Sequence, residues 1–352
     1  MNLRVVVAAG APKGTVRSTT APPYRRPWWL PGANLQTILP AIAVPAERAV
    51  FKRERWPSAG SDGAPDGDFV DIDWLADTTG APLWNPAMPL VVMFHGLEGS
   101  SQSHYSQALM GALRTRGWNG CVPHFRGCSG ELNHLPRAYH SGDSAEIDWV
   151  LRRIHAIRAP QTMYVVGISL GGNALAKWAG EHGAAAGQIV RALAAVSAPL
   201  DLAAAGTALG RGFNMLYTRM FLETLKQKSL SKMARFPGML DAARVRRARD
   251  LYEFDNLVTA PLHGFRDTDD YWARASAKPW LAHIGVPALV LNARNDPFLP
   301  ARSLPTASEV SRSVTLEQPA HGGHVGFATG PLPPGRIDWL PQRLLDFFDA
   351  HP

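Results

Sequence analysis

The chain has 352 residues and a net charge of +7, and hydrophobic residues make up 46% of it. This composition is typical of a globular chain with enough apolar material for a large core, and its 32 glycines and 29 prolines argue against a helix bundle. The only cysteines are Cys121 and Cys128, which excludes a disulfide scaffold and a zinc site built from cysteines.

Positive charge is concentrated between residues 200 and 250, where ten Lys or Arg residues accompany four Asp or Glu residues. Such a segment can bind nucleic acid, contact an anionic membrane surface or form a solvated face. It carries no recognisable nucleic-acid motif, so no nucleic acid is expected as a partner. The sequence has no long apolar signal core near its start and no run of ~18 apolar residues. We therefore expect a cytoplasmic protein without a transmembrane helix.

Residues 1–25 are rich in turn-forming residues and predict an irregular N-terminal segment, followed by one domain over 26–350. Residues 26–56 are too apolar for a tail and are expected to pack on that domain. Residues 69–75 alternate apolar with acidic side chains, which predicts an edge strand with one wet face. Continuous apolar runs predict strands at 90–94, 118–125, 163–167, 190–197, 287–292 and 313–316. Apolar residues at helical spacing predict helices at 104–116, 144–155, 170–181 and 336–350.

Strands that alternate with helices predict an α/β fold, with a mostly parallel sheet and helices on both faces. Residues 199–280 interrupt this alternation with a basic segment of helical composition that contains several methionines. An insertion at the ligand-binding end of a sheet predicts a helical cap over the site. The alternative is a helical excursion that buries its own apolar face.

The clearest local motif is G-x-S-x-G at residues 167–171, preceded by a predicted strand and followed by a predicted helix. This context is the one in which a nucleophilic serine occupies a sharp strand-to-helix turn, and the flanking glycines avoid clashes with neighbouring backbone. The helix that follows also offers free N–H groups and a positive dipole end. Ser169 is therefore the predicted nucleophile.

A serine hydroxyl needs a base, and the base needs an orienting acid. Asp296 follows a buried strand and is the predicted acid, with Asp201 after the preceding strand as the alternative. His324 lies in a glycine-rich loop 28 residues after Asp296 and is the predicted base, with His321 as its rival.

An oxyanion hole needs two backbone N–H donors. Leu170 follows the nucleophile and is expected to supply one of them. Leu97, in the loop after the strand at 90–94, is expected to supply the other. His95 in the same loop is expected to stabilise the loop rather than to act in catalysis.

Several motifs together resemble the YheT-like branch of the α/β-hydrolases. They are Asn34-Leu-Gln-Thr-Ile38, His95-Gly-Leu-Glu-Gly-Ser-Ser101, Phe125-Arg-Gly-Cys-Ser-Gly130, Gly167-Ile-Ser-Leu-Gly-Gly-Asn173, Asn295-Asp-Pro297 and His321-Gly-Gly-His324. The resemblance covers residues 26–350. It implies the α/β-hydrolase fold with a helical cap, a triad of Ser169, Asp296 and His324, and acyl esters as the substrate class.

We therefore expect a serine hydrolase that cleaves carboxylic esters, such as short- to medium-chain acyl esters or acylglycerols, through an acyl-enzyme on Ser169. This chemistry needs no metal and no organic cofactor. Two alternatives stay open: transfer of the acyl group to an alcohol by the same triad, and a non-catalytic ligand-binding protein of the same fold. The expected partners are a small acyl ester and, through the basic cap, an anionic membrane surface.

Overall fold

The computed structural model describes residues 23–44, 48–59 and 64–352. Most of the predicted N-terminal segment, residues 1–22, lies outside the described residues. Within residues 23–25, Tyr24 is buried and its hydroxyl donates to the carbonyl of Ala328.

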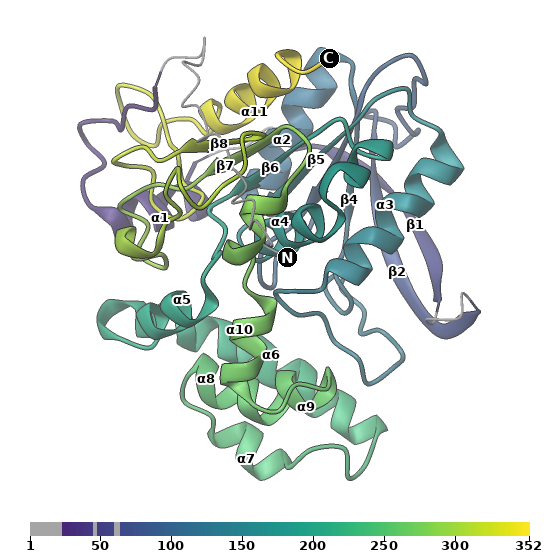
Figure 1. The fold of residues 1–352 in the computed structure, drawn as a ribbon, viewed down its shortest axis with the longest axis vertical. Coiled ribbons are helices and arrows are strands. Elements are labelled where there is room, and N and C mark those ends of the chain that lie inside the picture. The colour runs from purple at the N-terminus through teal and green to yellow at the C-terminus, as the bar shows by residue number, and fades with distance from the viewer. Residues whose placement is uncertain (1–22, 45–47, 60–63) are drawn as a thin grey trace, which may run out of the picture.

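An eight-stranded sheet in the order β1-β2-β4-β3-β5-β6-β7-β8 forms the centre of the molecule (Figure 1). The pairs β1·β2 and β2·β4 are antiparallel, and the five remaining pairs are parallel. The strands are β1 (Val50–Ala59), β2 (Pro65–Ala76), β3 (Leu90–Phe94), β4 (Asn119–Pro123), β5 (Met163–Ile168), β6 (Ala192–Val196), β7 (Ala288–Leu291) and β8 (Val314–Glu317). All residues of β3, β5 and β6 are buried, as expected for strands covered on both faces.

Helices cover both faces of this sheet. On one face, α3 (Ser144–Arg158) and α4 (Leu170–His182) bury residues such as Ile147 and Trp178. On the other face, α2 (His104–Arg116) and α11 (Trp339–Asp349) bury residues such as Met110 and Phe348. The predicted fold class, a mostly parallel sheet between two layers of helices, is confirmed.

The prediction of an edge strand with a wet face at 69–75 was wrong. β2 lies between β1 and β4, and β1 is the edge strand. Asp71 and Asp73 of β2 are buried beneath arginines of β1, with Arg55 Nε 2.8 Å from Asp71 and Arg53 Nε 2.7 Å from Asp73. Acidic side chains that pair with arginines across a ladder give the same sequence alternation as acidic side chains that face water.

The insertion between β6 and β7 is helical and projects from one end of the sheet (Figure 1). Its α-helices are α5 (Leu202–Leu209), α6 (Met215–Arg235), α7 (Ala242–Arg247), α8 (Leu251–Phe254), α9 (Ala260–Leu262) and α10 (Thr268–Ala275), with a π-helical turn at Asp255–Thr259. The insertion has its own apolar clusters, in which Leu222, Val245, Phe254 and Val258 pack together. We refer to residues 199–280 as the cap.

Candidate active site

Ser169 lies at a strained turn between β5 and α4. Its φ of 51° is in the left-handed region, which is costly for a residue with a side chain. The turn is held by close backbone approaches that only glycine permits. A Cβ on Gly167 would lie 2.5 Å from the carbonyl oxygen of Gly171, and a Cβ on Gly171 would lie 2.6 Å from that of His95. The predicted strand–serine–helix context of the motif is therefore the observed one.

The structure brings Ser169, His324 and Asp296 together from three distant parts of the chain. Ser169 Oγ lies 2.9 Å from His324 Nε2, and His324 Nδ1 lies 2.8 Å from Asp296 Oδ2. Asp296 is buried, and its other oxygen accepts from the N–H of Phe298 at 2.8 Å. An ionised carboxylate only accepts, so it holds the proton on Nδ1 and leaves Nε2 free to accept the serine proton.

The rival residues lie elsewhere. Asp201 is the N-cap of α5, where its side chain accepts from the N–H of Ala204 at 3.0 Å. His321 is exposed and does not line the cavity that contains Ser169.

Helix α1 (Ala33–Ile42) supports the loop that carries His324, which the sequence did not predict. Thr37 Oγ1 accepts from the N–H of His324 at 2.9 Å. Gln36 Oε1 accepts from Gly322 N and from Asn295 Nδ2, both at 2.9 Å, and Gln36 Nε2 donates to Leu30 O at 2.9 Å. The Asn-Leu-Gln-Thr-Ile motif lies 287 residues from its partner at His324, so no local pattern in the sequence indicates the contact.

Two backbone N–H groups are available beside Ser169. In the described part of the chain, neither Leu97 N nor Leu170 N has a hydrogen-bond acceptor. The Leu97 loop approaches the nucleophile closely, since a Cβ on Gly96 would lie 3.2 Å from Ser169 Cβ. Unpaired N–H groups at this position suit a developing oxyanion.

Buried side chains fix the loop at 95–99. The N–H of Phe125 donates to His95 Nε2 at 3.1 Å, so Nδ1 carries the proton and donates to Gly96 O at 2.8 Å. Burial lowers the pKa of His95 to about 3, which keeps the imidazole neutral. Tyr105 Oη accepts from Gly96 N at 3.0 Å. His95 thus has the loop-stabilising contacts expected of it.

A cavity of about 610 Å³ lies over Ser169, between the sheet and the cap. Its lining is mostly apolar and combines residues of α1, of the loops after β3 and β4, and of cap helices α5, α6 and α8. Cap residues such as Leu209, Met220 and Phe254 face the same space as Ser169 and His324. An apolar cavity with a few polar groups at one point is the usual form of a small-molecule site.

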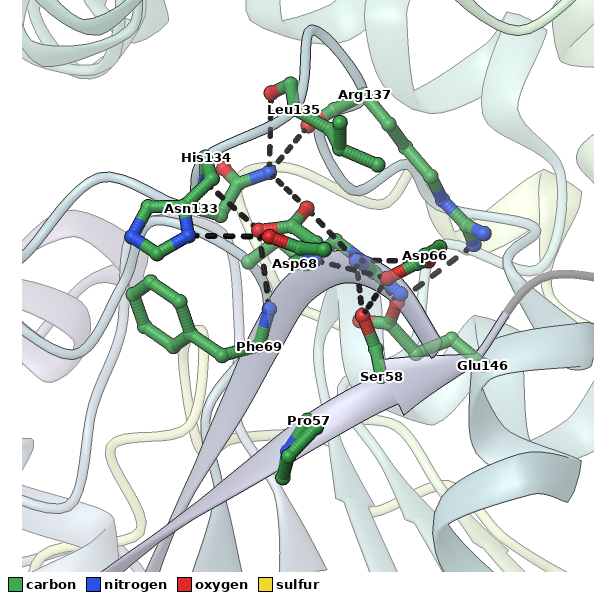
Figure 2. A network of polar contacts seen from close by, with 12 residues as sticks. Pro57, Ser58, Asp66, Asp68, Phe69, Asn133, His134, Leu135, Arg137 and Glu146 are labelled. Carbon is green, nitrogen blue, oxygen red and sulfur yellow. Dashed lines mark hydrogen bonds and ion pairs between the residues drawn. The ribbon is translucent and has the colours of Figure 1, made fainter. Parts of the chain in front are cut away.

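The loop after β4, which forms one wall of this cavity, is anchored by a buried charge network (Figure 2). Arg126 lies 2.8 Å from Asp68 Oδ2 and 2.6 Å from Glu146 Oε2, and all three side chains are buried. Asn133 Nδ2 also donates to Asp68 at 2.6 Å, and the N–H of His134 donates to it at 2.7 Å. These contacts hold residues 126–137 against β2 and α3.

The described residues contain no group of three or more His, Cys, Asp or Glu side chains arranged to hold a metal ion. Within the same ranges, no helix combines the length and the apolar character needed to cross a bilayer. Cys121 and Cys128 are both buried free thiols, and burial raises the pKa of Cys128 to about 12.

Comparisons with known proteins agree with this fold. The family model described as "alpha/beta hydrolase fold" matches residues 89–331. An Escherichia coli (strain K12) protein named "Putative esterase YheT" is 38% identical over 320 residues, which is 90% of each chain. "Phospholipase ABHD3" of Mus musculus is 29% identical over 271 residues, covering 76% of this chain and 66% of that protein. "Monoacylglycerol lipase" of Saccharomyces cerevisiae is 26% identical over 250 residues, covering 68% of this chain and 55% of that protein.

Among solved structures, an esterase of Pyrococcus furiosus superposes with a TM-score of 0.52 at 14% identity, over 95% of this chain and 98% of that one. Est1E of Butyrivibrio proteoclasticus, solved with ferulic acid, superposes with a TM-score of 0.51 at 16% identity, over 81% of this chain and 96% of that one. Identities this low establish the shared fold alone. By sequence and by fold, the chain belongs to the α/β-hydrolase family, in the branch that contains YheT.

Proposed function

We propose that this protein is a serine hydrolase that cleaves carboxylic esters, with Ser169 as nucleophile, His324 as base and Asp296 as the acid that orients the base. The observation that carries the proposal is the continuous relay of short contacts. Ser169 Oγ lies 2.9 Å from His324 Nε2, and His324 Nδ1 lies 2.8 Å from Asp296 Oδ2. This relay faces an apolar cavity. Esterase and lipase names among the relatives support the same reaction class.

In the proposed reaction, Ser169 Oγ attacks the ester carbonyl while His324 Nε2 takes the hydroxyl proton. The carbonyl oxygen becomes an oxyanion that the N–H groups of Leu97 and Leu170 stabilise. The C–O bond to the alcohol then breaks, and His324 returns the proton to the leaving alkoxide. Water, deprotonated by His324, attacks the acyl-enzyme. The bond between the acyl carbon and Ser169 Oγ then breaks, His324 returns the proton to Oγ, and the carboxylic acid leaves.

The substrates that we propose are esters of short- to medium-chain acyl groups, including acylglycerols. Apolar walls from the cap stabilise an aliphatic chain by removing it from water, at about 0.8 kcal/mol for each buried CH₂. The names of the relatives include a phospholipase and a monoacylglycerol lipase, so esters of glycerol are a reasonable first set of substrates.

The test is hydrolysis of p-nitrophenyl esters from acetate to palmitate by the wild type, Ser169→Ala and Asp296→Asn. We expect wild-type turnover, its loss in Ser169→Ala, and a fall in kcat of about 10³–10⁴-fold in Asp296→Asn. A fluorophosphonate probe should label the wild type and leave Ser169→Ala unlabelled. Ester hydrolysis that survives in Ser169→Ala would refute the assignment of the nucleophile.

Acyl transfer to an alcohol uses the same triad and differs only in the group that attacks the acyl-enzyme. Product analysis with and without added alcohol separates the two reactions. A non-catalytic ligand-binding protein would neither turn over esters nor react with the fluorophosphonate.

We also propose that the enzyme contacts anionic membrane surfaces at the mouth of the cavity. Ile42 of α1 and Met220 of α6 line the cavity, yet they are 77% and 61% exposed. Leu216 on the same helix face is 47% exposed, and the exposed Arg211 and Arg219 flank it. Exposed apolar groups beside cations suit a bilayer that contains anionic lipid.

Co-sedimentation with phosphatidylcholine vesicles, with and without phosphatidylglycerol, tests this contact at low salt. We expect tighter binding to the anionic vesicles and weaker binding of a Leu216→Ser/Met220→Ser variant. Ile157→Ser is the matched control, because Ile157 is 52% exposed on α3 and lies outside the cavity lining. Equal binding to both kinds of vesicle would refute the proposal. Cytoplasmic location stays a prediction from the sequence, and cell fractionation tests it.

A further inference from the structure

The loop that carries Leu97 is connected to the cap by one charged contact. Lys228 Nζ, from cap helix α6, lies 2.8 Å from Glu98 Oε2. Among the polar partners of residues 96–99 in the described ranges, Lys228 is the one that belongs to the cap. The Glu98 side chain is only 10% exposed, so protein partners rather than water must stabilise the charge of its carboxylate.

Glu98 directly follows the residue whose N–H we assign to the oxyanion hole, and its backbone is strained. Its φ is 55°, which a residue with a side chain adopts only when its surroundings hold it there. Tyr139 supplies part of this restraint. The N–H of Glu98 donates to Tyr139 Oη at 2.9 Å, and the Tyr139 hydroxyl donates to Glu98 Oε1 at 2.7 Å.

Tyr139 and Lys228 restrain Glu98 from different parts of the fold. The Tyr139 ring stacks on Phe125 with centroids 5.3 Å apart and is buried in the wall of the body of the protein. Lys228 comes from the inserted cap, and its side chain is 31% exposed. Among the described residues, the charged partner of the second carboxylate oxygen of Glu98 therefore comes from α6.

We infer that Lys228 is a positioning residue for ester hydrolysis: by pairing with Glu98 it holds the left-handed turn that aims the N–H of Leu97 at the oxyanion. The inference rests on the proposed function and deepens it, because it makes the oxyanion hole dependent on the docked cap. Lys228 lines the cavity, and its polar contacts in the described ranges are with Glu98 and Cys128 rather than with the proposed triad. Its loss should therefore weaken stabilisation of the transition state more than binding of the substrate.

The test compares Lys228→Met with Lys226→Met. Lys226 lies on the same helix, but its amine donates to the carbonyl oxygens of Arg246 and Ala248 within the cap, and it does not line the cavity. We expect Lys228→Met to lower kcat by about tenfold or more and to change KM by less than about threefold, since deleting one oxyanion donor outright costs about 10²–10³ in kcat. Lys226→Met should match the wild type.

Two further variants separate positioning from a general role in stability. Lys228→Arg keeps the charge and should restore most of the lost kcat. Glu98→Gln should lower kcat to a similar extent. Adding Lys228→Met to it should cause little further loss, because the two substitutions remove the same interaction. Thermal melts of all the variants report any loss of folded protein.

A reactive ketone gives a direct readout of the oxyanion hole. A trifluoromethyl ketone forms a hemiketal when Ser169 Oγ bonds to its carbonyl carbon, the serine proton passes to His324 and the oxygen becomes an oxyanion. We expect Lys228→Met to weaken inhibition by this ketone in parallel with kcat. Inhibition by a fatty alcohol of equal chain length should stay the same, because the alcohol forms no oxyanion.

Three results would overturn the inference. One is a kcat in Lys228→Met within about twofold of that in Lys226→Met. The second is an equal loss of affinity for the ketone and the alcohol, which would mean that Lys228 only shapes the cavity. The third is a wild type that neither reacts with fluorophosphonate nor hydrolyses any ester, in which case the proposed function fails as well. If the fluorophosphonate labels the wild type normally and the Lys228 variants keep the wild-type kcat, the inference is refuted and the proposed function stands.

Discussion

Gln36 offers a sharp test of how the loop of His324 is held, because its side chain is 1% exposed and makes three hydrogen bonds. Gln36→Met keeps the approximate volume and removes all three. The buried Gly322 N loses its acceptor and the buried Leu30 O loses its donor, while the half-exposed Asn295 can turn to water. A buried polar group left unpaired costs about 1–3 kcal/mol, so we expect a loss of about 2–6 kcal/mol.

In a chain of this length, that loss should lower Tm by about 3–8 °C. Because Gly322 and Asn295 lie beside the proposed triad residues His324 and Asp296, we also expect kcat to fall by about tenfold through misplacement of His324. Calorimetry and ester hydrolysis measure the two effects. The matched control is Gln342→Met, since Gln342 is exposed on α11 and its side chain, among the described residues, donates to Asp346 of the same helix.

Refutation would take the form of a Gln36→Met protein whose Tm lies within about 1 °C of that of Gln342→Met and whose kcat is unchanged. That result would mean that backbone contacts alone hold the loop of His324, and that the Gln36 side chain does not position it.

Three further predictions concern other parts of the structure. Arg126→Met should destabilise the protein by about 3–5 kcal/mol in denaturant titrations, because it removes the cation nearest to the buried Asp68 and Glu146 carboxylates and leaves Glu146 with Arg137 at 3.6 Å; a loss below about 1 kcal/mol would contradict this. Burial raises the pKa of Asp255 to about 6, so between about pH 4 and 6 the folded state binds more protons than the unfolded state and stability falls as pH rises. Asp255→Asn should therefore gain stability relative to wild type at pH 8, by up to about 3 kcal/mol, and much less at pH 4; an equal difference at both pH values would argue against it. Gly326→Ala should abolish activity and destabilise the fold, because its Cβ would overlap the carbonyl oxygen of Gln36, whereas a Cβ on Gly187 would meet only Val286 at 3.4 Å and Gly187→Ala should behave as wild type.

Local sequence determined the sheet and the sharp strand-to-helix turn at Ser169. Five or six consecutive apolar residues at β3, β5 and β6 are typical of strands covered on both faces. Gly167 is required by its approach to the backbone of Gly171, four residues away. These features depend on local sterics and burial, which the sequence pattern records directly, whereas the approach of Gly171 to His95 depends on the fold.

Only the tertiary structure decided which residues meet. The contacts of Thr37 with His324 and of Lys228 with Glu98 join segments that are far apart in the chain, and the pairing of Arg55 with Asp71 joins two neighbouring strands. A hydrogen bond between distant residues produces no periodic pattern in the sequence. An acidic residue in a strand also gives the same alternation whether its side chain faces water or an arginine. That is why the sequence predicted β2 as a wet edge strand and gave no role to α1. The sheet brings these groups together because parallel strands align their carboxyl ends at one edge, where loops from distant segments must share the same space.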